Sequence, residues 1–218
     1  DSPGGEVYGA DEAATVIRGV RASKPVVAVA NSLAASAAYY LASQANELLV
    51  TPSGEVGSIG VYAVHEDWSA ALDEGGVKVT FVSAGEGKTD GNDAQPLSDT
   101  AKADMQAAVD RYYSMFTAAV AKGRGVSVDR VRSEWKAKVY GAKQAVEVGM
   151  ADAVGTLDDA IRRASALARA RSAAPSATSL ESVLLVPKDW AAELAGAAMD
   201  DIEAEVDADV MARLRERG

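Results

Sequence analysis

Ser36 lies within an alanine-rich stretch, residues 31–43 (NSLAASAAYYLAS), that follows a short apolar run at residues 26–30 (VVAVA). The apolar run is typical of a buried strand, and the alanines indicate the start of a helix. A hydroxyl in such a turn faces whatever docks on the sheet edge, and the unpaired N–H groups of the helix start lie beside it. The pattern therefore predicts a nucleophile, although a serine among alanines is more often only a helix-start residue.

A serine hydroxyl needs a neighbouring base to become a nucleophile, and the sequence offers two candidates. His65, the single histidine, follows a predicted strand and has acidic neighbours. Lys88 lies in a polar, glycine-rich stretch at residues 83–96 (SAGEGKTDGNDAQP). A lysine acts as a general base only when burial lowers its pKa by several units from about 10.4. Because loop composition alone indicates a surface lysine, the residues by themselves leave the base open.

An alternation of predicted helices and strands must position these groups, and it indicates the α/β class. Besides residues 26–30, strands are expected at residues 47–50, 58–64 and 77–82, with an extended segment at 139–140 and turn-rich loops at 1–5 and 51–57. Short helices are expected at residues 11–21, 67–73, 128–135, 142–148 and 157–170. A long helix begins after an N-cap at Ser98, runs to Lys122 and is ended by Gly123.

The 218 residues, 48% of them apolar, suffice for one buried domain and an appendage. We expect a domain at residues 1–167, a linker rich in Ala, Ser, Arg and Pro at 168–179, and an acidic helical extension at 180–218. The opening residues DSPGG are typical of a loop after a strand, so we expect the first strands of the domain to be missing from this chain.

Composition excludes several functions. The chain has no cysteine and one histidine, which excludes a thiol nucleophile, a disulfide framework and a histidine-rich metal cluster, and we expect no cofactor. A net charge of −10 gives no electrostatic support for nucleic-acid binding. No run of about 18 apolar residues is present, so we expect a soluble chain without a membrane segment.

Six motifs in a fixed order carry a family resemblance: DSPGG, AASAAYYLAS, TPSGEVGSIGV, GKTDGNDAQPLSD, KGRGVSVDRV and KVYGAKQAVEVGMADAVGTLDDAI. Together they resemble the signal-peptide peptidase A family of serine peptidases, and most of all its soluble bacteriophage head-maturation (prohead) proteases. The similarity covers residue 1 to about residue 164. It implies a hydrolase, a serine endopeptidase, with a crotonase-like and Clp-protease-like α/β fold of repeated ββα units.

The resemblance also implies the site residues. The family nucleophile falls on Ser36, and the family lysine, the general base of a Ser-Lys dyad, falls on Lys88, 52 residues later. A second family serine, which orients the lysine, matches Ser58. The oxyanion hole is implied to consist of the backbone N–H groups of Gly5 and Ala37, and no metal takes part. This arrangement gives the histidine no catalytic role.

The family likeness further implies a homo-oligomer whose sites lie at protomer interfaces, with serine and lysine from neighbouring protomers. The implied partners are protein or peptide substrates: a capsid or scaffold protein, or signal-peptide-like segments with small apolar side chains. The implied location is the bacterial cytoplasm or a phage procapsid. The chain departs from the family where two glycines usually follow the nucleophile, because Ala37 and Ala38 stand there. It also has Ala137-Lys138-Val139-Tyr140 where the family has Gly-Arg-Val-Tyr.

Two alternatives stay open. The first is a Ser-His-Asp peptidase of the related caseinolytic type, in which His65 would be the base. The second is a non-catalytic assembly or scaffold protein that keeps the fold for its oligomer. The departure at Ala37 and Ala38 and the expected lack of the first strands favour this second alternative.

Overall fold

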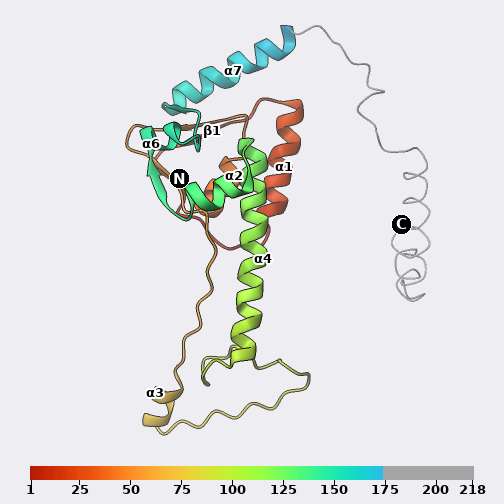
Figure 1. Ribbon diagram of the computed structural model, residues 1–218, viewed down its shortest axis with the longest axis vertical. Coiled ribbons are helices and arrows are strands. Elements are labelled where there is room, and N and C mark those ends of the chain that lie inside the picture. Colours follow the sequence, from red (N-terminus) through yellow and green to blue (C-terminus); the bar gives the residue numbers. More distant parts are fainter. Residues whose placement is uncertain (174–218) are drawn as a thin grey trace, which may run out of the picture. The chain divides into compact units, whose positions relative to one another are not determined.

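The fold alternates short strands with helices, and the computed structural model describes it for residues 1–173 (Figure 1). The helices are α1 (Ala10–Ser23), α2 (Ala37–Ala42), α3 (Ser69–Glu74), α4 (Asp99–Arg124), α5 (Val128–Arg130), α6 (Ala142–Glu147) and α7 (Leu157–Ala173), and a π-helix, η1 (Val131–Trp135), continues α5. The predicted mixed α/β class is confirmed. Helix α7 extends into the stretch expected to form the linker. The rest of that linker and the expected extension lie outside the described residues.

Within residues 1–173 the strands form two three-stranded sheets. The first holds β1 (Val27–Ala30), β3 (Glu47–Val50) and β6 (Ala153–Val154), all parallel. In the second, β2 (Leu33–Ala35) pairs in parallel with β4 (Glu55–Gly57), and β5 (Val139–Gly141) runs antiparallel to β4. Strand β2 was not predicted, so β2, and not the strand at residues 26–30, leads into Ser36. The chain changes sheet between β1 and β2, where the Asp1 carboxylate accepts the N–H and the hydroxyl of Ser32.

Two predicted strands, residues 58–64 and 77–82, are not formed. Strand β4 ends at Gly57, and neither segment pairs with another strand of the described chain. Both segments are rich in β-branched and aromatic residues, which favour extended backbone, but a strand also needs a neighbour that completes its hydrogen-bond ladder. The prediction was wrong because residues 1–173 supply no such neighbour.

Helix α4 begins as predicted and ends later than predicted. The Ser98 hydroxyl accepts a hydrogen bond from the N–H of Ala101 at 3.1 Å, which makes Ser98 the N-cap. Gly123, the predicted stop, lies inside the helix, where a Cβ would be 2.3 Å from the carbonyl oxygen of Ser43. The helix ends at Gly125, which takes the left-handed conformation with φ 66°. Glycine is therefore needed at position 123 for close packing against Ser43, and not for ending the helix.

The C-terminal half of α4 is fixed to the sheets. Its Phe116 ring meets the Tyr40 ring of α2 edge-on, with the centroids 4.7 Å apart. Arg124 forms a two-oxygen ion pair with Asp152 at 2.8 and 2.9 Å, and the same carboxylate accepts the N–H of Leu48 in β3. Burial acts to raise the pKa of Asp152, but these hydrogen bonds outweigh it and the pKa is lowered. The carboxylate therefore stays ionised at neutral pH and holds α4 against β3.

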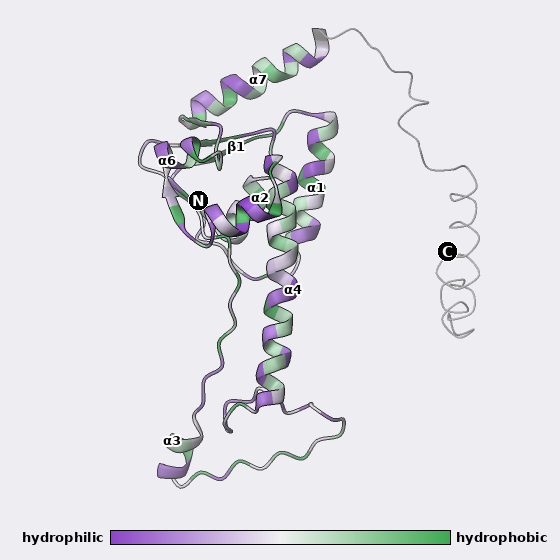
Figure 2. Ribbon diagram, in the orientation of Figure 1, coloured by the Kyte–Doolittle hydropathy of each residue, from purple (hydrophilic) through white to green (hydrophobic). Residues whose placement is uncertain are grey.

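Residues 61–97 form a projection that we call the arm. The chain leaves the sheets after β4, passes through α3 and returns to the N-terminal end of α4, far along that helix from the sheets (Figure 1). Hydrophobic residues are interspersed along both extended segments of the arm (Figure 2). Many of these side chains are exposed: Tyr62, Val64, Trp68, Val77, Val79, Phe81 and Val82. Because exposed apolar patches of this kind mark interaction surfaces, the arm presents a surface suited to a partner.

None of the helices within residues 1–173 has the length and apolar character that crossing a lipid bilayer requires.

Candidate active site

Ser36 occupies a sharp turn between β2 and α2, with φ 52° and ψ −124°. A residue with a side chain is uncommon at positive φ, and such backbone strain costs on the order of 1–3 kcal/mol. The surrounding structure holds it in place, since the Ser36 N–H donates to the carbonyl of Gly57 in β4 at 2.8 Å. The residue is half-buried, and within residues 1–173 its hydroxyl makes no hydrogen bond. The turn therefore presents an unengaged hydroxyl, as the strand-to-helix prediction expected.

Gly4 packs directly against this serine. Its φ is 117°, and a Cβ there would lie 2.6 Å from the Ser36 Cβ and 3.1 Å from the Ser36 Oγ. The loop is held at this distance because Ser2 donates its N–H to the Leu33 carbonyl and accepts the N–H of Ala35. Only glycine meets both the conformational and the steric requirement. Sequence reasoning selected Gly5 and missed Gly4, although the Gly-Gly pair in the sequence was the available signal.

Gly5 and Ala37 line the same pocket as Ser36. Within the described part of the chain the Gly5 N–H donates no hydrogen bond. Ala37 is the first residue of α2, where the N–H has no acceptor inside the helix. Two backbone donors beside an unengaged hydroxyl are the groups that a developing oxyanion requires. The structure thus brings these three predicted site residues together, and Ser58 joins them in a neighbouring cleft.

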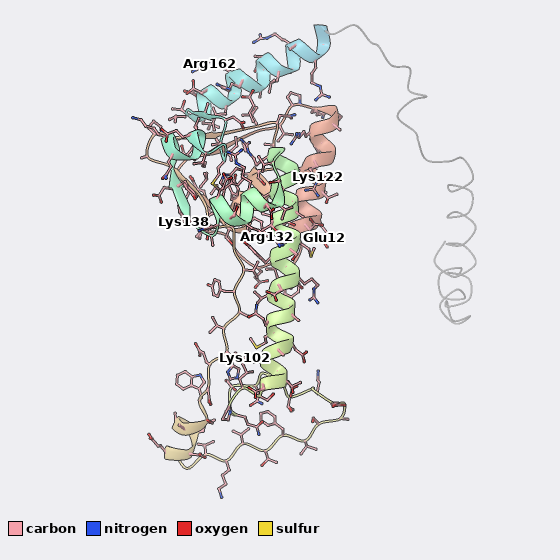
Figure 3. All side chains as sticks on the ribbon, viewed as in Figure 1. Glu12, Lys102, Lys122, Arg132, Lys138 and Arg162 are labelled. Carbon is pink, nitrogen blue, oxygen red and sulfur yellow. The ribbon has the colours of Figure 1, made fainter. Side chains whose placement is uncertain are left out.

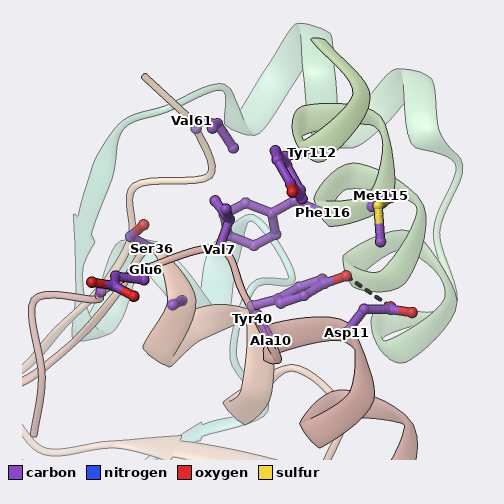
Figure 4. A pocket seen from close by; sticks show the side chains of 13 residues that line it. Glu6, Val7, Ala10, Asp11, Ser36, Tyr40, Val61, Tyr112, Met115 and Phe116 are labelled. Atoms are coloured by element: carbon purple, nitrogen blue, oxygen red, sulfur yellow. Dashed lines mark hydrogen bonds between the residues drawn. The ribbon is translucent and has the colours of Figure 1, made fainter. Parts of the chain in front are cut away.

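The pocket beside Ser36 is small, and most of its lining is apolar (Figure 4). Its cavity volume is about 40 Å³, and its large apolar lining residues are Val7, Tyr40, Val61, Tyr112, Met115 and Phe116. The Tyr40 hydroxyl donates to Asp11 at 2.9 Å. Burial first, and then this hydrogen bond, raise the pKa of Tyr40, so the phenol stays protonated at neutral pH. A cavity that holds a few water molecules has room for a short aliphatic side chain. Tyr112 and Phe116 fall inside the predicted long helix, and sequence reasoning did not assign them to a pocket.

Ser58, the predicted lysine-orienting serine, lies near Ser36. The two serines line one open cleft together with Gly4 and Gly5. Ser58 also has positive φ, 56°, and its N–H donates to the carbonyl of Lys138 at 2.7 Å. This bond holds the segment that follows β4 and leads into the arm against the segment that precedes β5. The cleft therefore contains two serines on strained backbone.

Lys88 is not brought to Ser36 within the chain. It lies in the arm and is exposed, and within residues 1–173 its ammonium makes no hydrogen bond or ion pair. The arm joins α4 at Asp99, whereas the Ser36 pocket contacts the same helix at Tyr112. At 1.5 Å per residue these two points of α4 are about 20 Å apart. Figures 1 and 3 show the lysine-bearing loop beyond the end of α4 that Lys102 marks.

His65 also lies in the arm and lines no pocket that contains Ser36. Its Nε2 is 2.8 Å from the carbonyl oxygen of Asn92. Across residues 1–173, no three histidine or acidic side chains are gathered in a way that could hold a metal ion.

The fold and site define a mixed α/β protein that presents a strained serine beside unpaired backbone donors, an arrangement used by serine hydrolases. Peptidase family S49 matches residues 18–171, and the chain belongs to this family. The family resemblance inferred from the motifs is thereby confirmed.

Individual relatives agree with this assignment. The chain is 40% identical over 161 residues to capsid assembly protease C of Escherichia phage lambda, with 74% of this chain and 36% of that protein covered. It is 39% identical over 161 residues to the head-tail preconnector protein GP5 of Enterobacteria phage P21, with 74% and 32% covered. The chain thus spans about a third of the length of these two relatives. Among solved structures, a single-residue mutant of the 1510-N membrane-bound stomatin-specific protease aligns with a TM-score of 0.47 at 13% identity, covering 75% of this chain and 65% of that one.

Proposed function

We propose that this chain is the catalytic part of a serine endopeptidase that cleaves protein substrates through an acyl-enzyme on Ser36. One observation carries the proposal: the strained turn holds the Ser36 hydroxyl unengaged beside the N–H groups of Gly5 and Ala37. Membership of peptidase family S49 supports it. We further propose that the strands and helices belong to a crotonase-like α/β arrangement.

In this mechanism the Ser36 Oγ attacks the scissile carbonyl carbon and gives its proton to a neutral Lys88 amine. The carbonyl oxygen takes up negative charge, which the Gly5 and Ala37 N–H groups stabilise. When the tetrahedral intermediate collapses, the peptide C–N bond breaks and the leaving amine takes the proton from Lys88. Water then attacks the acyl-enzyme and gives its proton to Lys88. The bond between the acyl carbon and the Ser36 Oγ breaks, the Oγ takes the proton back from Lys88, and the carboxylic acid product leaves. Ser58 would orient the lysine.

Lys88 would reach the site from a neighbouring protomer. Within one chain the arm carries Lys88 away from Ser36. The arm also has many exposed apolar side chains that a second copy could cover. Packing against that copy would remove water from the ammonium and so favour the neutral amine that a base requires. An oligomer would then complete the site and also bury the apolar surface of the arm.

The substrate we propose is a capsid or scaffold protein, or another chain with a small apolar residue before the cleaved bond. The two phage relatives named above support the first part, because the name of one of them describes a capsid assembly protease. The small cavity that Ser36 shares with α4 supports the preference for a small apolar residue, since about 40 Å³ suits a short aliphatic side chain.

Labelling with a fluorophosphonate tests the nucleophile. We expect the chain to be labelled at Ser36, because the unengaged hydroxyl and the two backbone donors favour attack on phosphorus and stabilise the resulting oxyanion. Ser36→Ala should lose the label, whereas Ser53→Ala, at an exposed serine outside the site, should keep it. Mass spectrometry of the labelled peptide identifies the residue.

The second candidate function is a non-catalytic assembly protein, and the separation of Lys88 from Ser36 within the chain favours it. The same labelling distinguishes the two, since an assembled wild-type oligomer that takes no label has no activated serine. In that outcome the peptidase proposal fails.

Met115 should restrict the size of the side chain that the pocket accepts. It lines the Ser36 pocket but is 40% exposed, so Met115→Ala opens the pocket with little loss of core packing. We expect kcat/KM for a peptide with leucine before the cleaved bond to rise about tenfold relative to the alanine peptide, because each methylene accommodated is worth about 1 kcal/mol or more.

The matched control is Met105→Ala, the same change on the same helix, at a residue that lines a groove without Ser36. It should leave the leucine-to-alanine ratio as in the wild type. An unchanged ratio in Met115→Ala would show that substrate side chains enter elsewhere.

A further inference from the structure

The two halves of the arm are joined by a half-buried histidine. The His65 Nε2 lies 2.8 Å from the carbonyl oxygen of Asn92, and because a carbonyl only accepts, Nε2 must carry a hydrogen and donate it. Three residues later, the N–H of Trp68 donates to the carbonyl of Asp93 at 2.8 Å. Among the described residues, the imidazole makes the one side-chain hydrogen bond that links residues 61–74 to residues 83–97.

Asn92 carries this connection to the residue next to Lys88. Its Nδ2 donates to the carbonyl of Thr89 at 2.8 Å and to the side chain of Gln95 at 3.2 Å. Its Oδ1 accepts the N–H of Ala94 at 3.0 Å. A continuous set of hydrogen bonds therefore runs from the outgoing half of the arm through Asn92 to the backbone beside the lysine.

The loop that carries Lys88 needs such an external attachment. Gly85, Gly87 and Gly91 have φ values of 95°, 75° and 74°, and glycine loses more conformational freedom on ordering than any other residue. The backbone bonds inside the loop are short-range, such as Lys88 N–H to the Gly85 carbonyl at 3.3 Å. A general base must reach the hydroxyl within hydrogen-bond distance, and a displacement of about 1 Å can cost about 100-fold in rate.

We propose that His65 is a positioning residue that fastens the Lys88 loop to the outgoing half of the arm and so sets where the lysine amine is presented. This inference rests on the proposed function, in which Lys88 is the general base. It gives the single histidine a role other than proton transfer.

Two substitutions of His65 test the proposal in the full chain, with a quenched fluorogenic peptide that carries alanine before the cleaved bond. We expect His65→Ala to lower kcat about tenfold, because the Lys88 loop loses its attachment. KM should be nearly unchanged, because neither His65 nor the Lys88 loop lines the pocket beside Ser36. His65→Gln should recover most of kcat, since its amide N–H reaches the position of Nε2. Ser83→Ala, an exposed arm residue without a hydrogen bond in the described chain, is the matched control and should behave as the wild type.

Hydrogen–deuterium exchange gives a readout that does not depend on activity. Amides of residues 85–96 should exchange several-fold faster in His65→Ala than in the wild type, His65→Gln or Ser83→Ala, because local opening follows the loss of attachment. Equal exchange in all four proteins overturns the proposal. So does a His65→Gln variant as inactive as Lys88→Ala, because the ring itself would then be required.

Failure of this inference is distinguishable from failure of the proposed function. If Ser36→Ala and Lys88→Ala are inactive while His65→Ala matches the wild type in kcat and exchange, only the positioning role is wrong. If Ser36→Ala or Lys88→Ala keeps full activity, the proposed function fails, and the exchange experiment still decides whether His65 holds the loop.

Discussion

Co-expression of Ser36→Ala chains with Lys88→Ala chains should restore peptidase activity that neither variant has alone. Each variant by itself should lose activity by about 10⁴-fold, because nucleophile and base act as one unit. In mixed oligomers, an intact serine lies next to an intact lysine at about a quarter of the sites if each site takes its two residues from adjacent protomers. The measurement is the initial rate on a fluorogenic peptide, per mole of assembled protein.

A second mixture makes this experiment decisive. The double variant Ser36→Ala and Lys88→Ala, co-expressed with wild-type chains in equal amounts, should also give about a quarter of full activity if sites are shared between protomers. If both residues come from one chain, the first mixture stays inactive and the second retains about half of full activity. That result would contradict the shared site and would require the arm to fold back onto its own chain.

Gly4→Ala should lower peptidase activity about 100-fold. The added methyl group would lie 2.6 Å from the Ser36 Cβ, and the backbone at φ 117° is unfavourable for any residue with a Cβ. Either the loop or the serine must move, and a displacement of about 1 Å at the reacting groups costs about 100-fold in kcat. Peptide hydrolysis and the rate of fluorophosphonate labelling should fall together.

Gly5→Ala is the matched control for this prediction. A Cβ at Gly5 meets no atom within 4 Å, and the substitution keeps the backbone N–H that we assign to the oxyanion hole. We therefore expect activity close to that of the wild type. If Gly4→Ala instead retained wild-type kcat with unchanged thermal stability, the close contact between the loop and Ser36 would have no part in catalysis.

The histidine alternative has little support from the arrangement of the site. A Ser-His-Asp peptidase would need His65 within hydrogen-bond reach of Ser36. Its Nε2 is engaged by the Asn92 carbonyl in the arm instead. In an oligomer, the arm of a neighbouring protomer carries both Lys88 and His65, and His65→Gln distinguishes these two candidate bases. The substitution removes the imidazole base but keeps an N–H that can donate to the Asn92 carbonyl, so a His65-dependent peptidase would lose activity and a Lys88-dependent one would keep it.

Local patterns were sufficient for the elements whose order depends on neighbouring residues alone. Helical periodicity and the Ser98 cap predicted the start of α4, and the short runs at residues 26–30 and 47–50 predicted β1 and β3 within a residue. They failed at residues 58–64 and 77–82, where high β-propensity is not matched by a pairing partner in the described chain. Local patterns also failed at Gly123, where glycine is needed because the carbonyl oxygen of Ser43, at the end of α2, packs against it.

The sequence by itself determined the family, the mixed α/β alternation and the position of Ser36 in a strand-to-helix turn, because these depend on residue type and spacing along the chain. Only the tertiary structure decided that Gly4 touches Ser36 and that the pocket beside Ser36 combines residues from the first loop, α2 and α4. It also decided that Lys88 is carried away from Ser36 by the arm. These are distances between segments remote in sequence, and they are set by strand pairing and helix packing, which no local pattern encodes.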